Sequence, residues 1–343
     1  HNLLAALVRE GYRVSCVQSR SDSPLVREQQ TLGIRHHWLD YHTGREFART
    51  TTDGADAERI FRAERPDLVV FSDCCPVSNL AARQVALARG IPYVVVVGFV
   101  GAYLAKSFAA RLPQLAAQYA AARQVVAVSQ ENLALLHRHF GLGADRGEVI
   151  HYGRPARFFT PRDPAVRARL RREQRIPDDA IVCFTAARLT AIKGFAYQLQ
   201  AAQQLRASPA GPRICFVWAG DGELRTQLEA EIERLRLGED IRLLGQRWDV
   251  ADWHDAADIF VLPSHLEGMP LAIMEAMAKG LPVVATAVSG IPEELGDTGQ
   301  LLPDPASLAT ALQDPLMKVF PPALLGRLVT IPYYPLSDEM LAK

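Results

Sequence analysis

The sequence has no excess charge of either sign, because its 343 residues include 38 Lys and Arg against 38 Asp and Glu. A chain without net charge has no global field to attract nucleic acid or an anionic membrane, so either contact would have to be local. Long apolar runs are also absent, and the longest, residues 91–100, is too short and too rich in Gly and Pro to cross a bilayer. We therefore expect no transmembrane helix and no nucleic-acid partner.

Cysteine is sparse. The five cysteines are an odd number without the spacing of metal ligands, and four of them lie in apolar, strand-like runs. No signal peptide is recognisable, because the chain opens at His1 inside an amphipathic helical pattern. These features predict a reducing, cytoplasmic location and a true start upstream of His1.

Apolar residues make up 49% of the sequence and charged residues 22%, which is typical of a globular protein. The length exceeds what one core usually serves, so we expect two domains. Short β-branched runs alternate with helical stretches, and this alternation predicts parallel strands joined by crossover helices. The first series of predicted strands is 12–17, 34–39, 67–71, 93–97, 124–128 and 148–151, and the second is 181–186, 213–218, 241–244, 259–262, 282–285 and 300–302.

Between the two series lies a stretch punctuated by Gly and Pro, residues 152–161, which predicts the linker. The expected domains are residues 1–155 and 156–325, followed by a segment at 326–343. The fold class is then α/β, with two Rossmann-like, doubly wound parallel sheets. Because parallel sheets bind ligands at the carboxyl ends of their strands, two such domains facing each other would form one cleft.

Residues 162–175 are locally basic. We interpret this stretch as a solvated helix face, in preference to a patch that holds anionic lipid headgroups at the inner face of a membrane. Its arginines are Arg162, Arg167, Arg169, Arg171, Arg172 and Arg175.

The most informative segment, residues 263–285, reads as a glycine loop after a strand, then a helix with Pro270 near its start, then a strand. A helix N-terminus after a strand offers free N–H groups and positive dipole character, which suit a diphosphate or its sugar. Glu267 lies in the loop and Glu275 inside the helix, and a carboxylate is a good acceptor for two neighbouring hydroxyls. Because Glu275 has apolar neighbours, it needs a partner to offset its desolvation.

Two further loops follow strands of the second series. Arg188 and Lys193 lie in the loop after residues 181–186, where two cations can neutralise a diphosphate leaving group. Gly220 begins a Gly-Asp-Gly turn after residues 213–218, which predicts a tight turn that could face a nucleotide. Two exposed basic residues in a turn would be the simpler explanation of the first loop.

Together these motifs resemble glycosyltransferase family 4: Arg188 with Lys193, residues 220–223, Pro263-Ser264, and Glu267 through Glu275 with the Gly-Leu-Pro-Val-Val-Ala that follows. The resemblance is dense from about residue 125 to 303. It implies the GT-B fold and retaining transfer of a sugar from a nucleotide donor, UDP-, GDP- or ADP-linked, without a cofactor or a bound metal.

The resemblance also implies a role for each matching residue. Arg188 and Lys193 hold the donor diphosphate, Glu267 orients the transferred sugar and Glu275 binds the ribose. Backbone N–H groups of three residues would approach the sugar or phosphate, and Arg247 would lie near the nucleobase. Those three residues are Gly268, Met269 and Leu271.

The sequence departs from the family in two places. Family members carry a strand and a glycine loop upstream of the first helix, and these are missing before His1. Many members also carry a His near the reacting centre, where this chain has Gly98. The end of the chain, residues 336–343, resembles the start of a final helix that crosses back to the N-terminal domain.

Three functions remain open from the sequence. The first is sugar transfer to a hydroxyl of a glycan, a lipid-linked molecule or a small molecule, as in polysaccharide or glycolipid biosynthesis. The second is a donor-binding but inactive interaction protein. The third is a nucleotide-sugar epimerase, whose own acid–base residues are not visible here.

Overall fold

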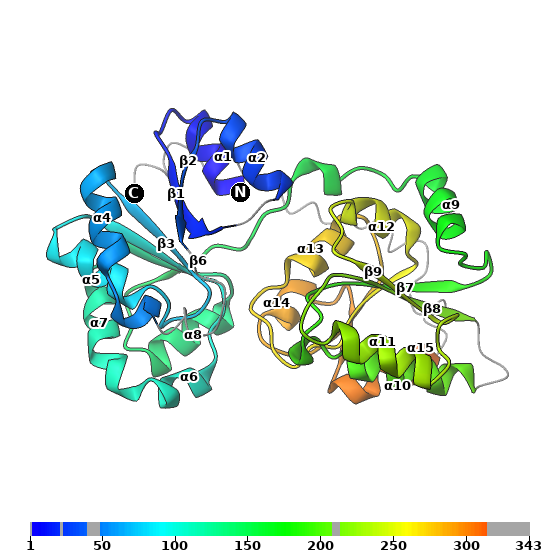
Figure 1. Cartoon of the computed structure of the whole chain (residues 1–343). Coiled ribbons are helices and arrows are strands. Elements are labelled where there is room, and N and C mark those ends of the chain that lie inside the picture. Colours follow the sequence, from blue (N-terminus) through cyan, green and yellow to red (C-terminus); the bar gives the residue numbers. More distant parts are fainter. Residues whose placement is uncertain (1, 21–22, 40–48, 208–212, 314–343) are drawn as a thin grey trace. The chain divides into compact units, whose positions relative to one another are not determined.

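The computed structural model describes residues 2–20, 23–39, 49–207 and 213–313. The chain divides into two compact units, His1–His151 and Tyr152–Lys343, and both consist of parallel strands alternating with helices (Figure 1). The predicted α/β class with two parallel-sheet domains is confirmed. The division falls at the start of the predicted linker, and the predicted segment 326–343 lies outside the described residues.

The first unit contains two parallel sheets where the sequence predicts one. Strands β1 and β2 pair with each other, and β3, β4, β5 and β6 form a second sheet in that order. The ladders stay separate because no described strand hydrogen-bonds to both β1 and β3. The elements of this unit are α1 Asn2–Arg9, β1 Ser15–Ser19, α2 Pro24–Thr31, β2 Arg35–Leu39, α4 Ala55–Glu64, β3 Val69–Asp73, α5 Leu80–Ala88, β4 Tyr93–Val97, α6 Ala102–Ser107, α7 Leu112–Ala121, β5 Gln124–Ala127, α8 Gln130–His139 and β6 Glu148–Val149.

The second unit has one six-stranded parallel sheet in the order β12-β11-β10-β7-β8-β9. Helices connect consecutive strands, as parallel pairing requires. Its elements are α9 Pro164–Glu173, β7 Ile181–Ala186, α10 Phe195–Arg206, β8 Ile214–Ala219, α11 Arg225–Arg234, β9 Ile241–Gly245, α12 Val250–Ala256, β10 Ile259–Leu262, α13 Leu271–Ala278, β11 Val283–Thr286, α14 Ile291–Leu295, β12 Gln300–Leu302 and α15 Leu308–Gln313.

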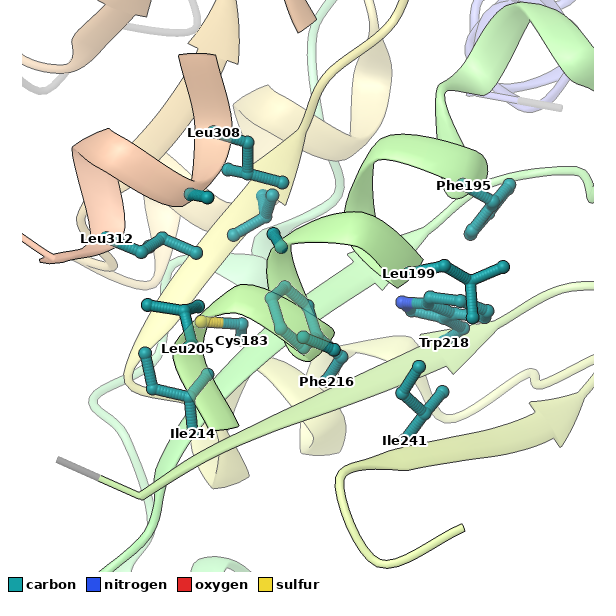
Figure 2. Packing of buried hydrophobic residues seen from close by; sticks show 14 of the residues in the cluster. Cys183, Phe195, Leu199, Leu205, Ile214, Phe216, Trp218, Ile241, Leu308 and Leu312 are labelled. Carbon is teal, nitrogen blue, oxygen red and sulfur yellow. The ribbon is translucent and has the colours of Figure 1, made fainter. Parts of the chain in front are cut away.

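Alternate side chains of this sheet enter two separate cores. Cys183 and Phe216 pack with α10 and α15 on one face, as Figure 2 shows, whereas Val182 and Phe184 pack with α12 and α13 on the other. The strands are apolar on both faces because helices cover both, and the sequence of each strand is therefore a continuous hydrophobic run. This burial fixes the sheet as a rigid base for the loops at its carboxyl edge.

The basic stretch before β7 is not a solvated face as a whole, so that interpretation is wrong for three of its arginines. Arg162 and Arg167 donate to backbone carbonyls at the end of α12, and Arg167 also pairs with Asp258 at 2.7 Å. Arg171, only 4% exposed, donates to Ala256 O and pairs with Asp258 at 2.5 Å. The last carbonyls of a helix have no intrahelical donor and carry partial negative charge, which attracts the guanidinium groups.

Candidate functional site

The strand order of the second unit reverses between β7 and β10. From β7 the chain continues outward through β8 and β9, whereas β10 is followed by β11 and β12 on the other side. At such a switch point the loops leave neighbouring strands toward opposite faces and open a crevice at the carboxyl edge of the sheet. The loops that leave β7 and β10 are those in which the sequence predicts charged site residues.

The two loops meet in a buried ion pair. Lys193 Nζ lies 2.6 Å from Glu267 Oε1, and the hydroxyl of Ser264 donates to the same oxygen at 2.7 Å. The side chain of Glu267 is 7% exposed and that of Lys193 is 16% exposed. Burial of a carboxylate costs hydration, and the contacts with this cation and this hydroxyl offset that cost. The structure therefore brings together two predicted residues, Lys193 and Glu267, and adds Ser264.

Close backbone contact holds the two loops in place. Lys193 ends a 3₁₀ turn, Ala191–Lys193, and Gly194 follows in the left-handed region with φ of 72°. A Cβ built on Gly194 would lie 1.9 Å from the carbonyl oxygen of Pro263, and His265 N donates to Ile192 O at 2.8 Å. Glycine at position 194 is thus required both by its φ and by the approach of the second loop.

Glu275 forms a second ion pair, as its apolar setting predicts. Arg154, from the linker stretch, donates through Nη2 to Glu275 Oε1. Glu275 Oε2 lies 3.9 Å from Nε2 of His254, a fully buried side chain of α12. Burial lowers the pKa of His254, so its ring is neutral near pH 7. Neither Arg154 nor His254 is predicted from the sequence, and a charged residue inside the Gly- and Pro-rich linker is the one local signal for Arg154.

The glycine loop between β10 and α13 leads directly into a helix start. Helix α13 begins at Leu271, which is 39% exposed, and Pro270 precedes it in an extended conformation. The N–H groups of Leu271 and Ala272 have no acceptor within the helix, whereas Ile273 N donates to Pro270 O at 3.0 Å. The loop is tied to the next loop, since Gly290 N donates to Gly268 O at 2.9 Å and Glu267 N to Ser289 Oγ at 3.4 Å. Met269, which follows Gly268 in this loop, is 5% exposed.

Among the described residues, the three remaining predicted ones form no hydrogen bond or ion pair with the Lys193–Glu267 pair. Arg188 is exposed in the loop after β7. Gly220 approaches the same loop so closely that a Cβ would lie 1.9 Å from Ala187 O. Arg247 pairs with Asp249, with 2.8 Å between Nε and Oδ1.

Glu294 in α14 is a buried acid that the sequence does not reveal. Burial and, to a smaller extent, the negative charge of Glu267 raise its pKa to about 9. A hydrogen bond with the Met274 backbone lowers this pKa but does not cancel the two other effects. Because the folded-state pKa exceeds the ordinary value of 4.5, the folded protein binds one more proton than the unfolded chain between those two pH values. Stability therefore falls as the pH rises through that window.

We expect Glu294→Gln to raise the free energy of unfolding at pH 8 by about 1–3 kcal/mol and to have much less effect at pH 5. The amide resembles the neutral acid in shape but cannot ionise. Urea unfolding at pH 5, 6.5 and 8 measures the difference. Glu239→Gln is the matched control, because that side chain is 86% exposed. An equal gain at pH 5 and pH 8 would contradict the assignment.

In the first unit, polar groups also gather at the carboxyl end of a strand. Asp73, fully buried at the end of β3, accepts from Asn79 at 2.7 Å and lies 3.4 Å from Arg83 Nη1. Burial raises its pKa to about 7. A hydrogen bond from Cys75 lowers the pKa of the exposed Cys74 thiol to about 6. Asp73 is thus an internal group, and Cys74 is the accessible one.

Two other structural findings bear on binding. A cavity of about 520 Å³ is lined by Gln174, Arg175, Arg213, Gly238, Glu239 and Arg242. It lies at the amino ends of β8 and β9, the edge of the sheet opposite to the loops described above. Among the helices that the structure describes, none combines the length and the apolar character needed to cross a membrane.

Comparison with known proteins matches this architecture over nearly the whole chain. The family described as "Glycosyltransferase Family 4" matches residues 1–158, and the family described as "Glycosyl transferases group 1" matches residues 180–317. The fold is that of GT-B glycosyltransferases, with two Rossmann-like parallel-sheet domains. Both matches are to glycosyltransferase families, and together they identify the chain as a member of the group 1 / family 4 glycosyltransferases.

Individual relatives agree with this assignment. The chain is 37% identical over 150 residues to the putative colanic acid biosynthesis glycosyltransferase WcaL of Salmonella typhimurium, covering 41% of this chain and 36% of WcaL. It is 31% identical over 261 residues to D-inositol 3-phosphate glycosyltransferase 1 of Catenulispora acidiphila, covering 69% of this chain and 61% of that enzyme. The matched parts thus span about a third to three fifths of these relatives.

The fold also matches a solved structure, Anabaena Alr3699/HepE in complex with UDP-glucose, at a TM-score of 0.71 and 21% identity, over 92% of this chain and 85% of that one.

One match is of a different kind. A stretch of 42 residues is 69% identical to the AAA+ ATPase ClpV1 of Pseudomonas aeruginosa, over 12% of this chain and 5% of that protein. So short a stretch does not assign the chain to a second family.

Proposed function

We propose that this chain transfers a hexose-type sugar, with retention of configuration, from a nucleoside diphosphate to an acceptor hydroxyl. The observation that carries the proposal is the Lys193–Glu267 pair at the switch point of the second sheet. A lysine and a carboxylate joined beside a free helix N-terminus offer a cation for a diphosphate and an acceptor for sugar hydroxyls. Membership of the family supports the same chemistry.

In this proposal each residue of the site has one task. Lys193 and Arg188 neutralise the diphosphate, so that side-chain cations rather than a metal ion offset its charge. The first N–H groups of α13 and the glycine loop approach the phosphate and sugar. Glu267 orients the sugar, Glu275 accepts hydrogen bonds from the ribose, and Arg247 lies toward the base.

The transfer step balances without a protein nucleophile. The bond between the sugar C1 and the diphosphate oxygen breaks, and the leaving diphosphate keeps the electron pair. The acceptor oxygen forms its bond to C1 on the same face of the sugar, and its proton passes to a phosphate oxygen of the leaving group. Lys193 and Arg188 stabilise the charge that develops on that group, which is a principal source of rate in such reactions.

The similarity of this chain to known glycosyltransferases suggests its substrates. The neighbour crystallised with UDP-glucose favours a UDP-sugar, with GDP- and ADP-sugars as alternatives. The names of the relatives point to a growing polysaccharide or a small phosphorylated polyol as the class of acceptor. We propose a role in polysaccharide or glycolipid synthesis at the cytoplasmic side of a membrane.

We expect one of UDP, GDP and ADP to raise the melting temperature by about 5–10 °C when present at 100 times its dissociation constant. Binding to the folded state alone adds about 2.7 kcal/mol at that concentration. The matching nucleoside monophosphate is the control, because it lacks the phosphate that Lys193 would bind. If no diphosphate shifts the melting temperature, the chain has no donor site and the proposal is wrong.

Turnover assays separate the remaining functions. An active transferase forms a glycoside and nucleoside diphosphate from the matching nucleotide sugar. Binding by calorimetry without turnover would instead select an inactive donor-binding protein. Free epimer of the nucleotide sugar, detected by NMR, would select an epimerase.

A further inference from the structure

Arg154 is the feature of the site that the proposed function leaves unexplained. It lies in the linker stretch, 121 positions before its partner Glu275. Its guanidinium lies over the ring of Phe158 at 5.1 Å, and Phe158 is itself 2% exposed. The side chains of Arg154 and Glu275 are 15% and 11% exposed. The contact is therefore sheltered, where an ion pair is screened less than at a surface.

Among the described residues, few charged groups lie near this pair. His254 faces Glu275 from α12, Arg157 acts on Arg154 from the linker, and Asp255 and Lys279 lie near His254. Asp255 and Lys279 neutralise each other at 2.8 Å. Because His254 is fully buried and its pKa is lowered, Arg154 supplies the positive charge in direct contact with Glu275.

The geometry leaves part of the Glu275 carboxylate available. Each carboxylate oxygen has two lone pairs, and Arg154 donates to Oε1 only. The distance of 3.9 Å from Oε2 to His254 Nε2 is too long for a hydrogen bond. Arg154 also has an unused donor, because its Nε is buried and has no hydrogen-bond partner among the described residues.

We propose that Arg154 is a positioning residue for ribonucleotide recognition, which holds the Glu275 carboxylate oriented so that Oε2 accepts from the ribose hydroxyls. This inference rests on the proposed function, since it takes the ribose to bind at Glu275. Without the guanidinium, the Glu275 carboxylate loses the hydrogen bond at Oε1 that fixes its orientation, and Oε2 is no longer held toward the ribose.

The test is calorimetric titration of wild type and Arg154→Met with the diphosphate that binds tightest among UDP, GDP and ADP, and with its 2′-deoxy form. We expect Arg154→Met to weaken binding of the ribonucleotide about tenfold. The 2′-deoxy form, lacking one hydroxyl, should lose less than threefold. Arg154→Lys, which restores the charge with a different shape, should recover part of the loss.

Arg157→Met is the matched control. Arg157 is exposed and lies over the same Phe158 ring at 5.2 Å, so this variant also removes one positive charge beside that ring. It should bind both nucleotides like the wild type. Melting temperatures show whether each variant is folded.

The outcomes distinguish the two claims. If the wild type binds none of the diphosphates, the proposed function fails and this inference with it. If the wild type binds but Arg154→Met binds the ribonucleotide equally well or more tightly, only the inference fails. Equal losses for both nucleotides would show that Arg154 merely supports the fold, which also overturns the inference.

Discussion

Replacing Lys193 by methionine is expected to lower the turnover of sugar transfer by about 100- to 1,000-fold, as removal of one preorganised electrostatic contact typically does. Methionine keeps most of the length of the side chain but cannot neutralise the leaving diphosphate. It also leaves the Glu267 carboxylate buried beside Ser264 without its cation. Steady-state assays with saturating nucleotide sugar measure the change.

Two further variants separate the contribution of the cation from that of the pair. Lys106→Met removes an exposed lysine of α6 and should leave turnover within about twofold. In Lys193→Met/Glu267→Gln the unpaired charge is absent, so stability should recover while turnover stays low. A Lys193→Met enzyme within tenfold of the wild-type rate would rule out a cation at the leaving group.

Gly194→Ala is expected to lower the free energy of unfolding by more than about 3 kcal/mol, a loss that single substitutions reach only through a specific conflict. An L-residue in the left-handed region costs about 1–2 kcal/mol, and the φ of Gly194 is 72°. The added methyl group would also lie 1.9 Å from Pro263 O, so the loop after β10 must move away. Lys193 and Ser264 flank this contact, and transfer should fall as well.

Gly238→Ala provides the comparison, because a Cβ at position 238 meets nothing within 4 Å. Urea unfolding of the two variants under the same conditions should show a near-neutral change for Gly238→Ala. Similar free energies for both variants would mean that the two loops do not need their close approach. The same result would remove the structural reason for glycine beside Lys193.

Local patterns predict the elements of this fold well. Each predicted strand corresponds to an observed one, and four have identical bounds, Ile181–Ala186 and Tyr93–Val97 among them. When helices cover both faces of a sheet, its strands are continuous hydrophobic runs, so short β-branched runs between helical stretches identify strands clearly. The division of the first unit into two sheets is not predicted, because pairing depends on which strands are adjacent in space.

The candidate site is predicted only in part. Lys193, Glu267 and Glu275 are recognised because loops after parallel strands and a helix start are local features with a known chemistry. Arg154 and Glu294 are not recognised, since each gains its character from burial beside residues distant in the sequence. The same holds for Arg171, whose local pattern indicates a solvated helix but which lies buried against Ala256 and Asp258.

By itself the sequence determined the class of this protein, its two-domain organisation and the loops that carry charged side chains, because periodicity and turn residues act over a few positions. Only the tertiary structure decided the partner of each charge. Lys193 meets Glu267 across 74 positions, and Arg154 meets Glu275 across 121. Such contacts follow from the order of strands in the sheet and from the approach of one loop to the next. The free energy of a buried charge is set by those neighbours and not by its place along the chain.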